Sequence, residues 1–287
     1  MTLAEALGQA TALGLTRLDG QLLLLHALGR AQGDRAWLLA RDTDPAAPEV
    51  QSAFLGLCQR RAGGEPLAYL VGRKEFFGLD LRVDRRVLVP RPDTETLVEW
   101  ALAILAGHPG WSCDPGLDAA AGPRVADLGT GSGAIALAIK NNCPGARVDA
   151  VDFSADALEI ARWNARALGL DIHLREASWL QDCADSYDLV VSNPPYVAAE
   201  DAHLAALTHE PLQALAAGRD GLDDIRTIIS QAPARLRPGG WLLLEHGHDQ
   251  AAKVRELLAG AGFRAVGSRR DLAGIERCSG GKWLERG

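Results

Sequence analysis

A glycine-rich turn between an apolar segment and a helical run constrains the fold of this chain more than any other feature. Residues 124–128 are expected to form a buried strand, residues 129–133 (Gly-Thr-Gly-Ser-Gly) follow, and residues 134–139 continue as an apolar helical run. Glycine lets the backbone turn sharply and pass close to a ligand at the start of a helix, where N–H groups point outward. This order predicts an α/β fold whose parallel sheet binds ligands at the carboxyl ends of its strands.

A carboxylate ends the next expected strand, residues 148–152. Asp152 follows the glycine turn by about 20 residues, which suits an acceptor for ribose hydroxyls. Residues 131–136 also match the dinucleotide fingerprint G-x-G-x-x-A, so an NAD-type enzyme is an alternative. Asp127 favours a different ligand, because a carboxylate at the lip of the turn would repel a pyrophosphate and attract the ammonium and sulfonium of S-adenosylmethionine. The candidate cofactor-binding residues are Asp127, Gly129, Thr130, Gly131, Ser132, Gly133 and Asp152.

The tetrapeptide Asn193-Pro194-Pro195-Tyr196 directly follows a second apolar run, residues 187–191. That run is expected to be a buried parallel strand, which places the tetrapeptide in the ligand cleft. The Asn193 side-chain carbonyl and a nearby backbone carbonyl can accept both N–H bonds of a planar NH₂ group, while the Tyr196 ring stacks on its face. The prolines stiffen the loop. The alternative is a plain tight turn after a strand.

Composition argues against several other classes of protein. The chain has 287 residues, 47% of them hydrophobic and 23% charged, and a net charge of −7, which disfavours nonspecific binding to nucleic acids or membranes. The longest apolar run, residues 22–25, is too short to span a bilayer, and no targeting segment is evident. The five cysteines are scattered and odd in number, so neither a disulfide framework nor a zinc site is expected, and a reducing cytoplasm fits best. No metal is expected, and His246 and His248 are interpreted as structural or solvent-facing.

The rest of the chain alternates between expected helices and strands. Residues 1–62 should form short amphipathic helices, the first with a Thr2/Glu5 capping box and the last beginning at Asp44-Pro45. Period-two alternation within residues 75–89 predicts a hairpin, and the proline- and glycine-rich residues 107–123 predict a surface loop. Further helices are expected at 93–105 and 155–168, and further strands at 171–174 and 240–245. This order predicts a doubly wound parallel sheet.

These motifs together resemble the seven-stranded, S-adenosylmethionine-dependent methyltransferases, and among them the protein-glutamine N5-methyltransferases of peptide chain release factors. The resemblance is carried by residues 127–133, by Asp152 and by the tetrapeptide at 193–196. Residues 89–95 (Val-Pro-Arg-Pro-Asp-Thr-Glu), Glu210-Pro211 and residues 243–247 (Leu-Leu-Glu-His-Gly) also follow the family pattern. It is close from about residue 65 to the end, and covers the amino-terminal part only in length and helical character.

The resemblance implies a Rossmann-like methyltransferase domain at 91–287, a helical substrate-recognition domain at 1–72 and a β-hairpin linker at 73–90. It implies S-adenosylmethionine as the cofactor and the glutamine of the Gly-Gly-Gln loop of class I release factors as the substrate, in the cytoplasm. Asn193, Pro194, Pro195 and Tyr196 would bind the glutamine, and Asn193, Pro194 and Tyr196 would be catalytic. Asn193 would also contact the cofactor. Trp179 would lie against the adenine, with a core tryptophan as the alternative, and Ser178 replaces an acidic residue frequent in the family.

Three other functions share part of this pattern. DNA adenine N6-methyltransferases carry the same tetrapeptide, but this chain is acidic and has only a small extra domain for reading a DNA target. Methylation of a ribosomal-protein glutamine is chemically identical and differs mainly at residues 89–95. A binding module without enzymatic activity would not need a clamp for a planar amide.

Residues 197–222 are the natural lid and are shorter than in the family.

Overall fold

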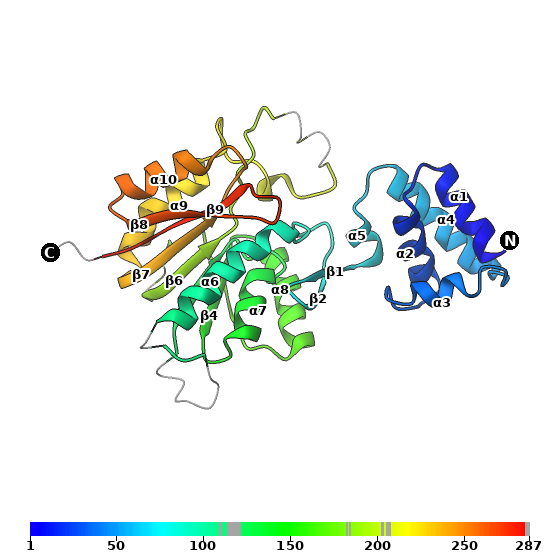
Figure 1. The fold of residues 1–287 in the computed structure, drawn as a ribbon, viewed down its shortest axis with the longest axis horizontal. Coiled ribbons are helices and arrows are strands. Elements are labelled where there is room, and N and C mark those ends of the chain that lie inside the picture. Colours follow the sequence, from blue (N-terminus) through cyan, green and yellow to red (C-terminus); the bar gives the residue numbers. More distant parts are fainter. Residues whose placement is uncertain are drawn as a thin grey trace. The chain divides into compact units, whose positions relative to one another are not determined.

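The computed structural model describes residues 1–108, 111–113, 122–181, 183, 185–201, 204 and 208–284. The chain divides into two compact units, Met1–Arg73 and Lys74–Gly287 (Figure 1). The surface loop expected at 107–123 lies largely outside the described residues. The boundaries expected at 72/73 and 90/91 stay predictions.

The first unit is helical. Leucine side chains of α2 and the Phe54 ring of α4 form its buried core, and Thr2 and Glu5 form the expected capping box on α1. The last long helix does not begin at Asp44-Pro45, so that prediction was wrong. Asp44 instead accepts a hydrogen bond from the N–H of Leu3 at 3.0 Å. The helices are α1 (Leu3–Ala12), α2 (Arg17–Ala27), α3 (Arg35–Leu39), α4 (Pro48–Ala62) and α5 (Leu67–Val71).

The second unit contains a seven-stranded sheet in the order β5-β4-β3-β6-β7-β9-β8, which confirms the expected fold class. Strands β3 to β7 are parallel to one another, and β9 is antiparallel to both β7 and β8. Strand β5 begins two residues later than expected, because pairing with β4 starts where His173 meets Asp149. The strands are β3 (Arg124–Leu128), β4 (Arg147–Asp152), β5 (His173–Glu176), β6 (Tyr187–Ser192), β7 (Leu236–Glu245), β8 (Arg264–Arg270) and β9 (Glu276–Lys282).

Helices cover both faces of this sheet. Successive strand residues point to opposite faces, so Leu189 and Val191 pack in the core beneath α6, α7 and α8, while Val190 packs in the core beneath α9 and α10. This two-sided burial explains why the central strands are continuous apolar runs. The helices are α6 (Glu95–Gly107), α7 (Ala134–Asn142), α8 (Ala155–Leu168), α9 (Asp223–Gln231) and α10 (Ala251–Gly260).

A β-hairpin packs against α8 near the start of this unit. Its strands are β1 (Arg73–Phe76) and β2 (Leu79–Arg82), and Phe77 and Gly78 in the turn both have positive φ. The buried Asn164 side chain of α8 accepts from the Arg82 N–H at 2.7 Å and donates to the carbonyls of Arg82 (3.0 Å) and Ser132 (2.8 Å). One amide therefore ties the hairpin to the glycine turn.

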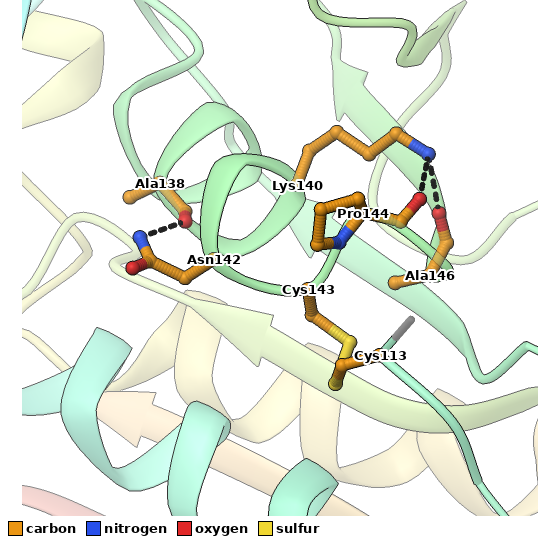
Figure 2. The surroundings of a disulfide bond; sticks show 7 residues. All are labelled: Cys113, Ala138, Lys140, Asn142, Cys143, Pro144 and Ala146. Carbon is orange, nitrogen blue, oxygen red and sulfur yellow. Dashed lines mark hydrogen bonds between the residues drawn. A yellow bond between two sulfur atoms is a disulfide. The ribbon is translucent and has the colours of Figure 1, made fainter. Parts of the chain in front are cut away.

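A disulfide joins Cys113 to Cys143, the residue directly after α7 (Figure 2). This corrects the expectation that the cysteines form no disulfide. Neither an odd count nor the lack of close spacing shows which cysteines the fold brings together across 30 residues. Beside it, the Lys140 ammonium donates to the carbonyls of Pro144 and Ala146, both at 2.8 Å, and closes the turn after α7.

Candidate active site

The glycine turn is fastened to β4 by its own N–H groups. Gly129 and Thr130 both donate to the Val151 carbonyl, at 2.8 and 2.9 Å, and Gly131 donates to the Asp152 carboxylate at 2.9 Å. Positive φ at Gly129, Gly131 and Gly133 explains why glycine is needed. The sequence predicted that these N–H groups would face a ligand, and for the bonded ones this was wrong. A pyrophosphate needs such donors, so the geometry disfavours the dinucleotide alternative.

Asp127 lies beneath the turn rather than at its lip. Its side chain is fully buried, and Oδ2 accepts from the Thr130 hydroxyl at 2.6 Å and from the Ala136 N–H at 3.1 Å. The Oδ1 atom is buried and has no hydrogen-bond partner among the described residues. Burial raises the pKa of Asp127 to about 7. The turn is thus built over a costly carboxylate, whose negative charge is weakly compensated by the protein itself.

Asp152 ends β4 at the edge of a cavity. Its Oδ1 atom accepts from the Ser154 N–H at 2.9 Å and its Oδ2 atom from Gly131, so each oxygen keeps a lone pair for a ligand. Burial raises its pKa, and the hydrogen bonds from Ser154 and Gly131 oppose that rise. This geometry suits an acceptor of two hydroxyl hydrogens.

The cavity has a volume of about 230 Å³ and lies at the carboxyl ends of the central strands. Trp179 forms part of its wall from a backbone with a φ of 53°, a strained value for a bulky residue. A Cβ atom on Gly129 would lie only 3.3 Å from the Trp179 ring, so the turn and the ring pack closely. The ring also packs against the core beneath α9, as the core alternative expects, and its contact with the adenine stays a prediction. The other residues that line the cavity include Gly131, Asp152, Ser178, Asn193, Pro195, Asp224 and residues 86–88.

The tetrapeptide leaves β6 at the same edge. Asn193 faces the cavity, and its Nδ2 atom donates to the Thr94 hydroxyl at 3.3 Å. Among the described residues, no group donates a hydrogen bond to its Oδ1 atom. The Tyr196 carbonyl accepts from the Gln250 side chain at 3.0 Å, and the Tyr196 hydroxyl donates to Glu245 at 3.4 Å. Gly221 packs so closely on the tetrapeptide that a Cβ atom there would lie 2.1 Å from the Tyr196 carbonyl oxygen.

Residues 89–95 connect the tetrapeptide to other segments of the second unit through ion pairs and a hydrogen bond. Arg91 pairs with the buried Glu210, Asp93 pairs with Arg277 at 3.2 Å, and Thr94 contacts Asn193. This explains why the sequence carries Pro-Arg-Pro-Asp-Thr-Glu far from the tetrapeptide in the chain. From the sequence, these segments were predicted only through the family resemblance, and no role was predicted for Thr94, Glu245 or Gln250. A buried polar residue inside an apolar strand end, such as Glu245, was the available signal.

Comparisons with known proteins agree with this geometry. Residues 115–260 match the family model of the methyltransferase small domain, and residues 2–72 match the PrmC N-terminal domain. The chain is 51% identical to the release factor glutamine methyltransferase of Bordetella pertussis, across 93% of this chain and 95% of that protein. The chain belongs to the release factor glutamine methyltransferase family. The enzyme of the same name from Xylella fastidiosa strain Temecula1 is 48% identical, across 93% of this chain and 94% of that protein.

A solved structure shows the same fold at lower identity. The T. thermophilus 16S rRNA N2 G1207 methyltransferase RsmC, in complex with AdoMet and guanosine, matches with a TM-score of 0.53 and 20% identity, over 73% of this chain and 49% of that chain. In the part of this methyltransferase that the structure describes, none of the helices is long and apolar enough to cross a membrane.

Proposed function

We propose that this enzyme methylates the side-chain amide nitrogen (N5) of the glutamine in the Gly-Gly-Gln motif of class I peptide chain release factors, in the cytoplasm, with S-adenosylmethionine as the methyl donor. The observation that carries the proposal is Asn193, which lines the cavity with its amide nitrogen bonded to Thr94 and with a side-chain oxygen that no described residue binds. Membership of the release factor glutamine methyltransferase family supports the same substrate.

The residues around the cavity fit this methyl donor. Asp152 would accept the ribose hydroxyls, Trp179 would lie against the adenine, and the open space beside Gly131, where a Cβ atom would meet nothing within 4 Å, would admit the donor close to the backbone. The buried charge of Asp127 would favour the sulfonium and ammonium through space rather than by contact. When bound, the donor supplies an electrophilic methyl carbon.

The protein would act on the glutamine mainly by orientation. An amide nitrogen is a poor nucleophile because its lone pair is delocalised into the carbonyl. The Asn193 Oδ1 atom and the Pro194 carbonyl would accept its two N–H bonds, stabilise the positive charge that develops on nitrogen, and aim the lone pair along one direction. Tyr196 would hold the amide plane. The methylated amide is acidic and can lose its proton late, so no strong base is required.

The three other functions predict different substrates. A DNA adenine methyltransferase would need a basic surface, whereas this chain carries a net charge of −7. A ribosomal-protein methyltransferase would use the same clamp, and a binding module would bind a partner without transferring a methyl group. The methylated substrate therefore separates the three enzymes, and methyl transfer itself separates them from a binding module.

A transfer assay with tritiated S-adenosylmethionine tests the proposal. Label should enter a class I release factor and should not enter the same factor with its Gly-Gly-Gln glutamine replaced by alanine. Duplex DNA and isolated ribosomal proteins should stay unlabelled. Equal labelling of the release factor and its alanine variant would refute the assignment of the glutamine.

A further inference from the structure

The Asn193 side chain works in the proposed reaction only in one of its two amide orientations. An asparagine amide has nearly the same shape after a half-turn, which exchanges its acceptor oxygen and its donor nitrogen. A glutamine NH₂ group needs the oxygen, because the nitrogen would present hydrogens to hydrogens. Something behind Asn193 has to choose between the two.

Thr94 contacts the back of Asn193 but cannot choose alone. Its Oγ1 atom lies 3.3 Å from Asn193 Nδ2, and the Thr94 side chain is almost fully buried, at 4% exposure. A hydroxyl can either accept from an amide nitrogen or donate to an amide oxygen. The orientation of the Asn193 amide therefore depends on which group accepts a hydrogen bond from the Thr94 hydroxyl.

Glu245, at the end of β7, is the group that can take it. Its carboxylate is buried and its Oε1 atom accepts from the Tyr196 hydroxyl at 3.4 Å, whereas its Oε2 atom has no close hydrogen bond among the described residues. The Thr94 hydroxyl lowers the pKa of this carboxyl, which is the effect of a donor that favours the charged form. An ionised carboxylate only accepts, so it draws the Thr94 hydrogen toward itself and leaves a Thr94 lone pair for Asn193.

Groups on the neighbouring elements shift the pKa of the Glu245 carboxyl. Burial raises the pKa of Glu245 to about 7, the Thr94 hydroxyl and the Arg277 guanidinium lower it, Asp93 raises it, and the Tyr196 hydroxyl lowers it. Cys278 of β9 faces it too, and its own thiol pKa is raised by burial and by Glu245. The carboxylate is thus available as an acceptor above neutral pH.

We propose that Thr94 and Glu245 are positioning residues that fix the Asn193 amide with Oδ1 toward the substrate nitrogen. This inference rests on the proposed function for its consequence in catalysis. Its structural content, the orientation of one side chain, does not depend on which substrate is used.

Two substitutions of Thr94 form a matched pair. Thr94→Val keeps the volume and removes the hydroxyl, and Thr94→Ser keeps the hydroxyl and removes a methyl group. We expect Thr94→Val to lower the single-turnover rate about tenfold, the scale of one lost hydrogen bond. We expect Thr94→Ser to stay closer to the wild type, with the KM for the release factor and the Kd for S-adenosylmethionine little changed in both. A packing role predicts the reverse order, and that order would overturn the proposal.

A second measurement is independent of activity. The two side-chain N–H signals of Asn193, assigned by their loss in Asn193→Ala, should keep their positions in Thr94→Ser and shift in Thr94→Val. Unshifted signals in a folded Thr94→Val protein would contradict the relay even if the substrate were not a release factor. Conversely, if Thr94→Val shows the expected shifts but the wild type leaves release factors unmethylated, the proposed function would be refuted and the positioning of Asn193 by Thr94 would stand.

Discussion

At the scale of single residues, the proposed chemistry depends on Asn193. Asn193→Ala should reduce turnover by roughly 10² to 10³, the range found when one preorganised polar contact to developing charge is removed. Its side chain is only partly buried, so the fold should survive. Thermal melting and single-turnover methylation of the same sample would check this. An asparagine that only capped a turn would instead give a less stable protein with full activity per folded molecule.

Asp127 predicts a dependence of stability on pH. Its pKa in the folded protein, about 7, is raised above the ordinary value of 3.8. Protonation of Asp127 therefore stabilises the folded protein. This stabilisation is fully present at pH values below the ordinary pKa of the group, and it is lost as the pH rises through 7. Asp127→Asn should melt above the wild type at pH 8 without cofactor, with the gap closing toward pH 4, and should bind S-adenosylmethionine more weakly. A gap that does not change with pH in calorimetry would argue against this account.

At the scale of elements, the tetrapeptide loop depends on the segment before α9. Gly221 has a φ of 71°, and a Cβ atom there would overlap the Tyr196 carbonyl oxygen. Gly221→Ala should therefore move the loop, lowering both the methylation rate and the melting temperature. Gly274→Ala is the matched control, because Gly274 has a φ of 80° and open space around it. If the two substitutions lower the methylation rate and the melting temperature equally, backbone strain alone would explain the loss, and the contact between Gly221 and the tetrapeptide would have no role.

Much of the fold followed from local pattern. The glycine turn, the buried strands at 124–128 and 187–191 and the helix at 155–168 were predicted because each has a strong periodicity or a turn signal. The start of α4 was misplaced because two prolines, Pro45 and Pro48, offered the same signal. The site was predicted as a set of motifs. Their connections through Thr94, Glu245 and Gln250 could not be, since contacts across distant segments leave no periodic trace.

At the scale of the whole molecule, the disulfide predicts a dependence of stability on redox state. Closing a loop of 30 residues limits the unfolded chain and is worth about 3 to 4 kcal/mol. Reduction should lower the melting temperature of the wild type and leave Cys113→Ser unaffected. Of the five cysteines, three should react with a thiol reagent in the unfolded, unreduced protein and all five after reduction. Five reactive thiols without reduction would contradict the bond.

In the proposed reaction, the clamp at Asn193 directs a methyl group to one amide nitrogen. Fragmentation mass spectrometry of a release factor after one turnover, with wild-type enzyme and Asn193→Ala in parallel, tests it most directly. We predict one added methyl group on the side-chain nitrogen of the Gly-Gly-Gln glutamine with the wild type, and almost none with the variant over the same time. A methyl group at another residue, or equal modification by a folded Asn193→Ala protein, would contradict the account.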